Sequence, residues 1–420
     1  MRRAHHRAAL LLSSVLTCGV PVGAAGVSTP AYAAPACATT AVPSAQVADR
    51  AAVPWSVATA DLGRLSGIAD GRGVTVAVID SGVRPIAPLA GRVISGYDLI
   101  GGSDGRTDCV GHGTAVASII AAGPAAGVGF RGLAPKATIL PIRVSDAELV
   151  DGAPSGPAAD AAGLASGIRD AVRRHADVLN LSLILGVDVP AVRRAVADAV
   201  AAGVVVVASV GNSHTASGPD PTPYPAAYPG VIGVGAIDPD GRRSPTSTIG
   251  PFVDVVAPGG SVTAARLPSG LTVVDGTSFA VPYVAATAAL VRQALPELTG
   301  AQVAARILDT ADPPVDGGPP EAYGHGVVDP YRAVTAVLPG ESTAGRATPP
   351  GSAPSTSPAA RPAGARLPPP RAIGDTGTGA PGADDSARVA WGAFAVTVTA
   401  LVVAAVAAGA RRRGPVHGRH

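Results

Sequence analysis

Several features that mark particular classes of protein are scarce in this chain. Aromatic residues make up 3% of its 420 residues, and there are three cysteines and one methionine. The formal net charge is +2 and basic runs occur only near the two ends, so nothing indicates a nucleic-acid partner. The few cysteines and scattered histidines show no zinc-binding spacing, and no glycine-rich phosphate loop stands out. We therefore expect neither a cofactor nor a metal.

One short acidic segment, residues 238–241 (Asp-Pro-Asp-Gly), resembles part of a calcium-binding loop. It lacks the further oxygen ligands and the terminal glutamate that such a loop needs. We predict a β-turn there rather than a metal site.

The first 33 residues have the pattern of an export signal. Three arginines among the first seven residues precede a mainly apolar run at 8–16, and Ala-Tyr-Ala at 31–33 matches the small-x-small sequence before a cleavage point. The alternative is a buried N-terminal helix, but the three features occur in the order that a signal peptide requires. We predict a signal peptide at 1–33.

The cysteines fit this interpretation. Cleavage would remove Cys18 and leave Cys37 and Cys109, an even pair in an oxidising compartment. We predict that these two form a disulfide, which would connect the N-terminal part of the mature chain to the loop just before His112.

Apolar runs alternate with helical patterns from residue 74 onward. Residues 74–79 form a run of β-branched residues interrupted only by Ala77, which is typical of a strand buried on both faces. Such alternation predicts an α/β fold with a mostly parallel sheet covered by helices on both faces. Further strands are expected at 138–144, 178–183, 204–208, 231–237 and 253–257, and helices at 115–122, 158–175, 192–202, from 278 onward, and at 299–309.

The C-terminal part of the chain changes in composition. Residues 339–388 are rich in Pro, Gly, Ser, Thr and Ala and have almost no large apolar side chains, which predicts a flexible linker. Residues 389–410 are uncharged and apolar for 22 residues, enough to cross ~30 Å of hydrocarbon. Three arginines begin the tail at 411–420 and favour a cytoplasmic C-terminus. A buried core helix is the alternative for 389–410.

Three residues suited to acyl transfer fall at predicted element boundaries. Asp80 follows the first strand, His112 lies between glycines at a helix start, and Ser278 lies at another helix start after Gly-Thr. Serine needs a base to remove its proton, histidine titrates near neutrality, and a carboxylate orients the imidazole. Each residue alone has an ordinary interpretation as a helix cap or loop residue. The three together, in the order Asp, His, Ser, predict a catalytic triad.

A fourth residue, Asn212, follows a buried strand and a glycine. Its side-chain amide could donate to the oxyanion that develops when a serine attacks a carbonyl. Alone, it would be interpreted as a turn residue. Pro282 is expected in the first turn of the helix that carries Ser278, where a missing N–H costs little.

The sequences VAVIDSG, GHGTAVA, GNS and GTSFAVP resemble those of the subtilisin-like serine proteases, or subtilases. The resemblance covers residues 74–338 and implies a three-layer subtilisin-like fold and an endopeptidase with Asp80, His112 and Ser278 as its triad and Asn212 in the oxyanion hole. Phe279 and Val281 depart from the more usual Met and Ala. An unrelated serine hydrolase would need a G-x-S-x-G elbow, which is not found around Ser278.

Finer features are similar to those of the mycosins, the membrane-anchored subtilases associated with type VII secretion in actinobacteria. These features are the export signal, the Tyr-Pro-Ala-Ala-Tyr-Pro sequence at 224–229, the Gly-His-Gly-Val-Val-Asp-Pro sequence from 324, the linker and the apolar segment. The resemblance implies an extracytoplasmic active site, secreted proteins as substrates, and a type VII membrane complex as partner. It leaves open a scaffolding role that is separate from catalysis.

The resemblance also suggests where a peptide would bind. Residues 181–186 (LSLILG) look like an edge strand that pairs with an extended peptide, through Ser182, Leu183 and Gly186. Ser209 and Gly211 look like one wall of a narrow first pocket, which is expected to be slightly altered because Ser-Val replaces the more usual Ala-Ala. A plain core strand is the alternative for 181–186.

Subtilases often carry a folded inhibitory pro-segment before the catalytic domain. Residues 34–73 are too few for one, so we expect an extension that wraps around the peptidase domain at 74–338.

Overall fold

The computed structural model describes residues 37, 48–150, 153–155, 157–215 and 218–339. The predicted signal peptide, nearly all of the linker, the apolar segment 389–410 and the tail lie outside these residues. Among the described residues, no helix combines the length and the apolar character that crossing a membrane requires.

A parallel sheet forms the centre of the described structure, as the alternation of elements predicts. Its seven strands follow the order β2-β3-β1-β6-β7-β8-β9, and every neighbouring pair is parallel. β1 is an inner strand, since Val76 pairs with Ile139 on one side and Val178 on the other. The strands are β1 (Thr75–Asp80), β2 (Tyr97–Asp98), β3 (Thr138–Arg143), β6 (Val178–Leu181), β7 (Val205–Ser209), β8 (Val231–Ile237) and β9 (Val255–Pro258). β2 was not predicted, and the ends of the other six strands differ from the predicted ends by at most two residues.

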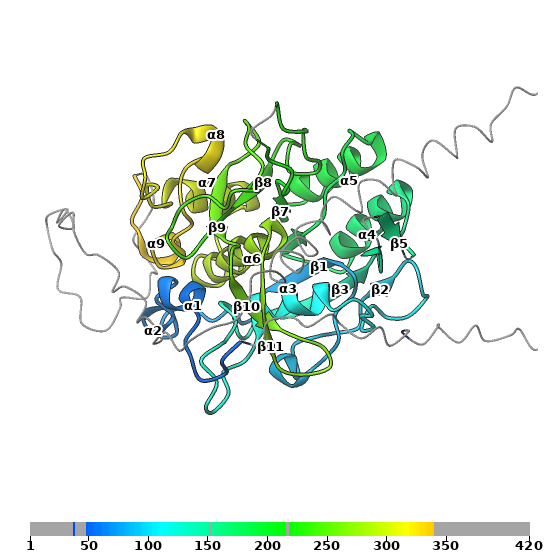
Figure 1. Ribbon diagram of the computed structural model, residues 1–420, viewed down its shortest axis with the longest axis horizontal. Helices are drawn as coiled ribbons and strands as arrows, with labels where there is room; N and C mark the ends of the chain where they lie inside the picture. Colours follow the sequence, from blue (N-terminus) through cyan, green and yellow to red (C-terminus); the bar gives the residue numbers. More distant parts are fainter. Residues whose placement is uncertain (1–36, 38–47, 151–152, 156, 216–217, 340–420) are drawn as a thin grey trace, which may run out of the picture. The chain divides into compact units, whose positions relative to one another are not determined.

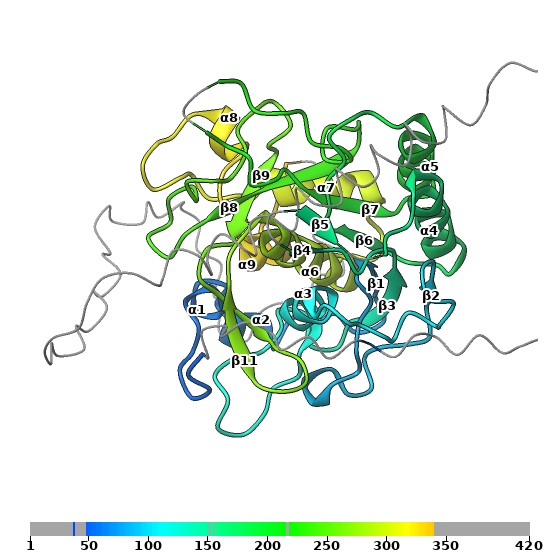
Figure 2. The ribbon, with the colours of Figure 1, turned by 45° about the vertical axis from the view of Figure 1, so that its right-hand side comes forward.

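Helices cover both faces of this sheet and complete three layers (Figures 1 and 2). Along β1, Val76 and Val78 belong to one hydrophobic core, whereas Ala77 and Ile79 belong to the other, because successive side chains point to opposite faces. The first core contains α3 (His112–Ala121), α6 (Thr277–Ala294) and α7 (Gly300–Asp309), and the second contains α4 (Ala161–Arg173) and α5 (Pro190–Ala201). Figures 1 and 2 both show α4 and α5 side by side, away from α3 and α6.

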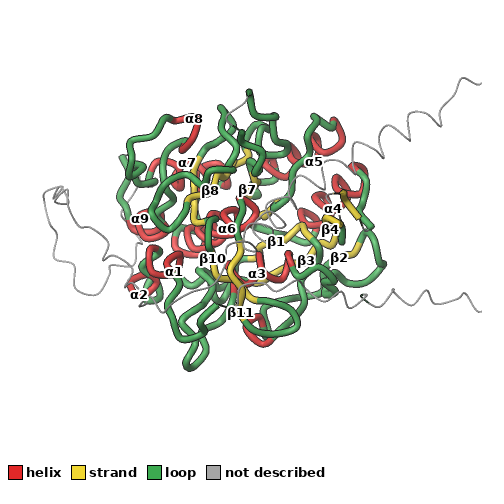
Figure 3. The backbone as a smooth tube through the Cα atoms, in the orientation of Figure 1, coloured by secondary structure: helices red, strands yellow, loops and turns green. Residues whose placement is uncertain are grey.

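Short elements that the sequence patterns did not predict surround these layers. Two of them lie in the predicted extension, where Val57, Leu62 and Leu65 are buried in the first core. A β-hairpin of β10 and β11 lies beside α3 (Figure 3). The unpredicted elements are α1 (Trp55–Thr59), α2 (Leu62–Leu65), the 3₁₀ helix Ala87–Leu89, β4 (Glu148–Val150), β5 (Ala153–Ser155), β10 (Val262–Ala265), β11 (Leu271–Val274), α8 (Pro320–Tyr323) and α9 (Pro330–Thr335).

Pro282 does not lie in the first turn of its helix, so that prediction is wrong. It is the sixth residue of α6, and its missing N–H leaves the carbonyl of Ser278 without the usual partner four residues on. The Ser182 hydroxyl donates to that carbonyl over 2.7 Å. The helix therefore continues through the proline, and the segment after β6 is attached to the first turn of α6.

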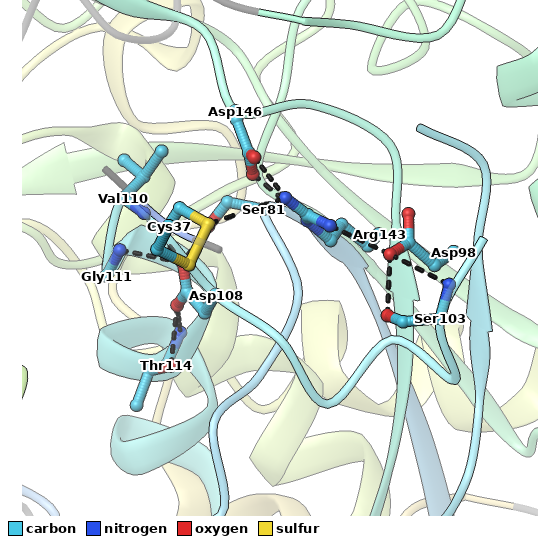
Figure 4. Close-up of a disulfide and its surroundings, with 11 residues drawn as sticks. Cys37, Ser81, Asp98, Ser103, Asp108, Val110, Gly111, Thr114, Arg143 and Asp146 are labelled. Atoms are coloured by element: carbon cyan, nitrogen blue, oxygen red, sulfur yellow. Dashed lines mark hydrogen bonds and ion pairs between the residues drawn. A yellow bond between two sulfur atoms is a disulfide. The ribbon is translucent and has the colours of Figure 1, made fainter. Parts of the chain in front are cut away.

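The predicted disulfide and the predicted turn are both present. Cys37 and Cys109 are joined, with their Cα atoms 5.1 Å apart, so the N-terminal segment is tied to the loop three residues before His112 (Figure 4). In the turn at 238–241, the Gly241 N–H donates to the carbonyl of Asp238 over 2.9 Å.

Candidate active site

Asp80, His112 and Ser278 come together from three elements. Asp80 ends β1, His112 begins α3, and Ser278 is the second residue of α6. His112 Nδ1 lies 2.8 Å from Asp80 Oδ1, and His112 Nε2 lies 3.1 Å from Ser278 Oγ. All three side chains are buried. The fold thus forms a continuous chain of hydrogen bonds from carboxylate through imidazole to hydroxyl.

The carboxylate determines which imidazole nitrogen carries the proton. An ionised carboxylate only accepts hydrogen bonds, so Nδ1 of His112 is the donor to Asp80. In the neutral ring, Nε2 is then the acceptor that faces the Ser278 hydroxyl. The same Asp80 oxygen also accepts from the Ser81 N–H over 2.7 Å, whereas its other oxygen has no hydrogen-bond partner among the described residues. The carboxylate is held mainly on the side that faces the imidazole.

Ser278 lies in the first turn of α6, where backbone N–H groups lack partners within the helix. The preceding Gly276 has φ 135°, a value that residues with side chains rarely adopt. The absence of a side chain also leaves space in front of the serine. A Cβ on Gly276 would lie 3.3 Å from Asn212 Nδ2 and 3.5 Å from Ser278 Oγ. The amide nitrogen and the hydroxyl therefore border the same space.

Asn212 is held in place by the residue before the serine. Its Oδ1 accepts from the Thr277 N–H over 2.9 Å, which turns Nδ2 to the opposite side of the amide. The Thr277 hydroxyl lies 2.6 Å from that of Ser209 and accepts from the Gly211 N–H over 3.2 Å. Ser209 is buried, so its side chain fastens this segment to α6 instead of facing a pocket.

A second buried carboxylate, Asp108, supports the start of α3 and was not identified from the sequence. It accepts hydrogen bonds from the Ser81 hydroxyl over 2.9 Å, the Gly111 N–H over 2.7 Å, and both the N–H and the hydroxyl of Thr114 over 2.9 and 2.5 Å (Figure 4). Burial raises the pKa of Asp108 to about 6, although the bonds with Thr114 and Gly111 favour its charged form. Asp108 and Ser81 connect the ends of the segments that carry His112 and Asp80.

The predicted peptide-binding segment 181–186 is only partly an edge. Its first residue belongs to β6, an inner strand. The side chain of Leu183 is buried in the second core, and both backbone groups of Leu185 are paired with Tyr224, over 2.6 and 3.0 Å. Gly186 is exposed. The backbone of Leu185 is therefore already engaged by Tyr224, whereas peptide binding by Ser182, Leu183 and Gly186 stays a prediction.

Phe279, which replaces a more usual Met, packs against the imidazole. Its ring centroid lies 5.0 Å from that of His112, and the side chain is fully buried. It therefore forms an apolar wall on one side of the ring and leaves the hydrogen bonds of His112 intact.

The family model described as the subtilase family matches residues 71–326, which include Asp80, His112, Asn212 and Ser278. The chain belongs to the subtilase family. This subtilase is 37% identical over 314 residues to mycosin-4 of Mycobacterium tuberculosis, a match that covers 67% of this chain and 69% of that protein. It is a mycosin-like serine endopeptidase.

Several solved structures are similar to this subtilase. The MycP3 protease from the type VII (ESX-3) secretion system has a TM-score of 0.60 and 31% identity, covering 70% of this chain and 92% of that chain. A chain of the periplasmic assembly from the ESX-5 inner membrane complex has a TM-score of 0.59 and 31% identity, covering 76% and 94%. These likenesses agree with the three-layer fold described above.

Proposed function

We propose that this subtilase hydrolyses peptide bonds through Asp80, His112 and Ser278. The Ser278 hydroxyl attacks the scissile carbonyl while Nε2 of His112 takes its proton, and the imidazolium then gives that proton to the leaving amine. Water then attacks the acyl-enzyme with His112 again acting as base and then as acid, and the second product leaves from Ser278. Asp80 keeps the imidazole in the tautomer that accepts from the serine, and it stabilises the imidazolium. The observation that carries this proposal is the hydrogen-bond chain of 2.8 and 3.1 Å.

The oxyanion of the tetrahedral intermediate would be held by two donors. One is the backbone N–H of Ser278, which lies in the first turn of α6. The other is Nδ2 of Asn212, whose orientation is set by the bond between Oδ1 and the Thr277 N–H. Donors that are fixed before the reaction stabilise the developing charge without reorganising.

We also propose that the chain is exported and anchored in the membrane. Residues 1–33 would direct export, 389–410 would anchor the chain, and the linker at 339–388 would hold the peptidase domain (74–338) outside the membrane with the C-terminus in the cytoplasm. The likeness to a type VII protease and to a chain of an inner-membrane assembly supports association with a type VII secretion complex. Secreted proteins would then be the substrates.

Peptide-bond hydrolysis through Ser278 is tested with the full-length chain purified in detergent. The measurement is the cleavage of a denatured protein substrate. The wild type should cleave it, and Ser278→Ala should not. Ser66→Ala is the matched control, because this serine is exposed, lies before the peptidase domain, and donates its hydroxyl only to the nearby Gly63 carbonyl. Full cleavage by Ser278→Ala would contradict the proposal.

A scaffolding role is the second candidate, because one similar chain is part of a periplasmic assembly. Comparing protein secretion in a Ser278→Ala strain and in a deletion strain separates the two. Equal defects would mean that catalysis accounts for the phenotype, whereas normal secretion by the mutant would mean that the folded chain suffices.

A further inference from the structure

A small cavity of about 110 Å³ lies close to the candidate active site. Its lining includes Ile184 and Gly186 from the segment after β6, Val210 and Gly211 from the segment after β7, and residues 221–223. Pockets that hold drug-sized ligands measure roughly 300–1,000 Å³, so this cavity is small by comparison.

The first two of these segments are fastened to the turn that carries the nucleophile. The Ser182 hydroxyl donates to the Ser278 carbonyl over 2.7 Å, and the Gly211 N–H donates to the Thr277 hydroxyl over 3.2 Å. In a substrate, the Cα that carries the side chain lies about 1.5 Å from the carbonyl carbon under attack. With that carbonyl between Ser278 and Asn212, the side chain enters the space beside Gly211, the residue before Asn212.

Ile184 occupies much of that space. A Cβ on Gly211 would lie 2.7 Å from Ile184 Cδ1 and 3.2 Å from Thr248 Oγ1, so the isoleucine reaches as far as the backbone of the opposite segment. Ile184 is 7% exposed, so its side chain is held by its neighbours. Because isoleucine is branched at Cβ and stiff at χ1, it cannot swing aside as an unbranched side chain would.

We propose that Ile184 limits the first specificity pocket to small side chains, so that this subtilase cleaves after glycine or alanine and rejects large apolar or aromatic residues. The inference rests on the proposed function, since it concerns the residue whose carbonyl Ser278 attacks. Ile184, which lies between the predicted peptide contacts Leu183 and Gly186, is thus the residue that sets specificity.

The test uses two tetrapeptide p-nitroanilides that differ only in having alanine or phenylalanine before the scissile bond. For each, kcat/KM is measured with the full-length wild type, Ile184→Gly and Ile184→Ala. We expect the wild type to prefer alanine and Ile184→Gly to raise the phenylalanine-to-alanine ratio by roughly 10- to 200-fold, the range that a difference of a methylene or so makes in an apolar pocket. Ile184→Ala, which keeps a Cβ, should give a smaller increase.

Val187→Gly is the matched control, because Val187 lies on the same segment but is 43% exposed and does not line the cavity. It should leave the ratio unchanged. A wild type that uses phenylalanine as well as alanine would overturn the inference, and so would an unchanged ratio in Ile184→Gly and Ile184→Ala with unaltered melting temperatures. Those results would leave the proposed function intact. If no variant cleaved either substrate, the proposed function itself would fail, and the inference with it.

Discussion

Two buried charged clusters lie at the same edge of the sheet and differ in how their carboxylates are bonded. The Asp80 cluster is Asp80 with His112, and the Arg143 cluster is Arg143 with Asp98 and Asp146. β1, β3 and β2 are neighbours, and Asp80 and Arg143 are register partners, as are Arg143 and Asp98. Asp80 bonds His112, whose imidazole takes up and releases a proton in the proposed reaction. Asp98 instead bonds the permanently charged Arg143 over 2.8 Å (Figure 4).

The two carboxylates also differ in how fully they are bonded. Asp98 accepts from the N–H groups of Ile100 and Gly101, from the Ser103 hydroxyl and from Arg143, over 2.6–3.0 Å. Asp80 accepts through one oxygen from the Ser81 N–H and from His112, and its other oxygen has no hydrogen-bond partner among the described residues. A fully bonded charge is fixed in place, whereas a partly bonded one can respond when a proton moves. We infer that the Arg143 cluster, which also contains Asp146, contributes to stability and the Asp80 cluster to chemistry.

The largest effect should come from removing the base. His112→Ala should lower kcat by roughly 10⁶-fold, the magnitude known for the corresponding change in subtilisin, a member of the same family. Because the triad acts as a unit, adding Ser278→Ala to His112→Ala should cause little further loss. The measurement is kcat for peptide hydrolysis by the single and double variants. Losses that multiplied in the double variant would show that the two residues act independently.

Disrupting the Arg143 cluster should lower the stability of the folded chain. Arg143→Met leaves the buried carboxylates of Asp98 and Asp146 without their cation, which should reduce the free energy of unfolding by about 3–5 kcal/mol. Arg173→Met is the matched control: its ion pair with Asp170 has an arginine side chain that is 63% exposed, so the loss should be at most about 1 kcal/mol. Denaturant unfolding measures both. Equal losses would remove the distinction between the clusters.

The third effect concerns the side-chain donor to the oxyanion. Asn212→Ala should lower kcat by roughly 100- to 1,000-fold, the range known for the oxyanion-hole asparagine of subtilisin, with little change in KM. Asn212→Asp keeps an acceptor for the Thr277 N–H but removes the amide donor, so it should lose at least as much. Steady-state kinetics checks both variants. If Asn212→Asp kept the wild-type kcat, the residue would serve only to position Thr277.

The smallest effect concerns Asp108, which lies beside both clusters. Its pKa is about 6 in the folded chain against 3.8 for a free carboxyl, so the folded state binds more protons between these pH values. The free energy of unfolding should therefore fall by about 3 kcal/mol as the pH rises from about 4 to about 6, at about 1.4 kcal/mol per pKa unit. The pKa of Asp98 shifts in the opposite direction. Burial alone would raise this pKa, but bonds with Ser103, Gly101 and Arg143 lower it.

The measurement is denaturant unfolding between pH 4 and pH 7 for the wild type and Asp108→Asn. The difference between the two curves should decrease through this range. Parallel curves would mean that Asp108 is ionised throughout in the folded chain.

The sequence was most informative where the determinants are local. Apolar runs predicted β1, β3, β6, β7, β8 and β9, because parallel strands covered on both faces are apolar on both sides. Asp80, His112, Asn212 and Ser278 were found because each follows a strand or begins a helix, and the carboxyl edge of a parallel sheet brings such positions together.

What the sequence missed depends on contacts between distant segments. Nothing near Arg143 shows that it pairs with Asp98, 45 residues earlier. The bond from Ser182 to the Ser278 carbonyl spans 96 residues and explains how α6 continues through Pro282. Likewise, Ile184 looks like an ordinary strand residue until Gly211 is placed opposite it.

The proposed mechanism depends on activation of the Ser278 hydroxyl by His112. We would measure this activation by incubating the full-length chain with a fluorophosphonate and locating the adduct by mass spectrometry. We predict a single adduct on Ser278 that is lost in Ser278→Ala and strongly slowed in His112→Ala. No adduct on the wild type, or one formed equally fast without His112, would contradict the account.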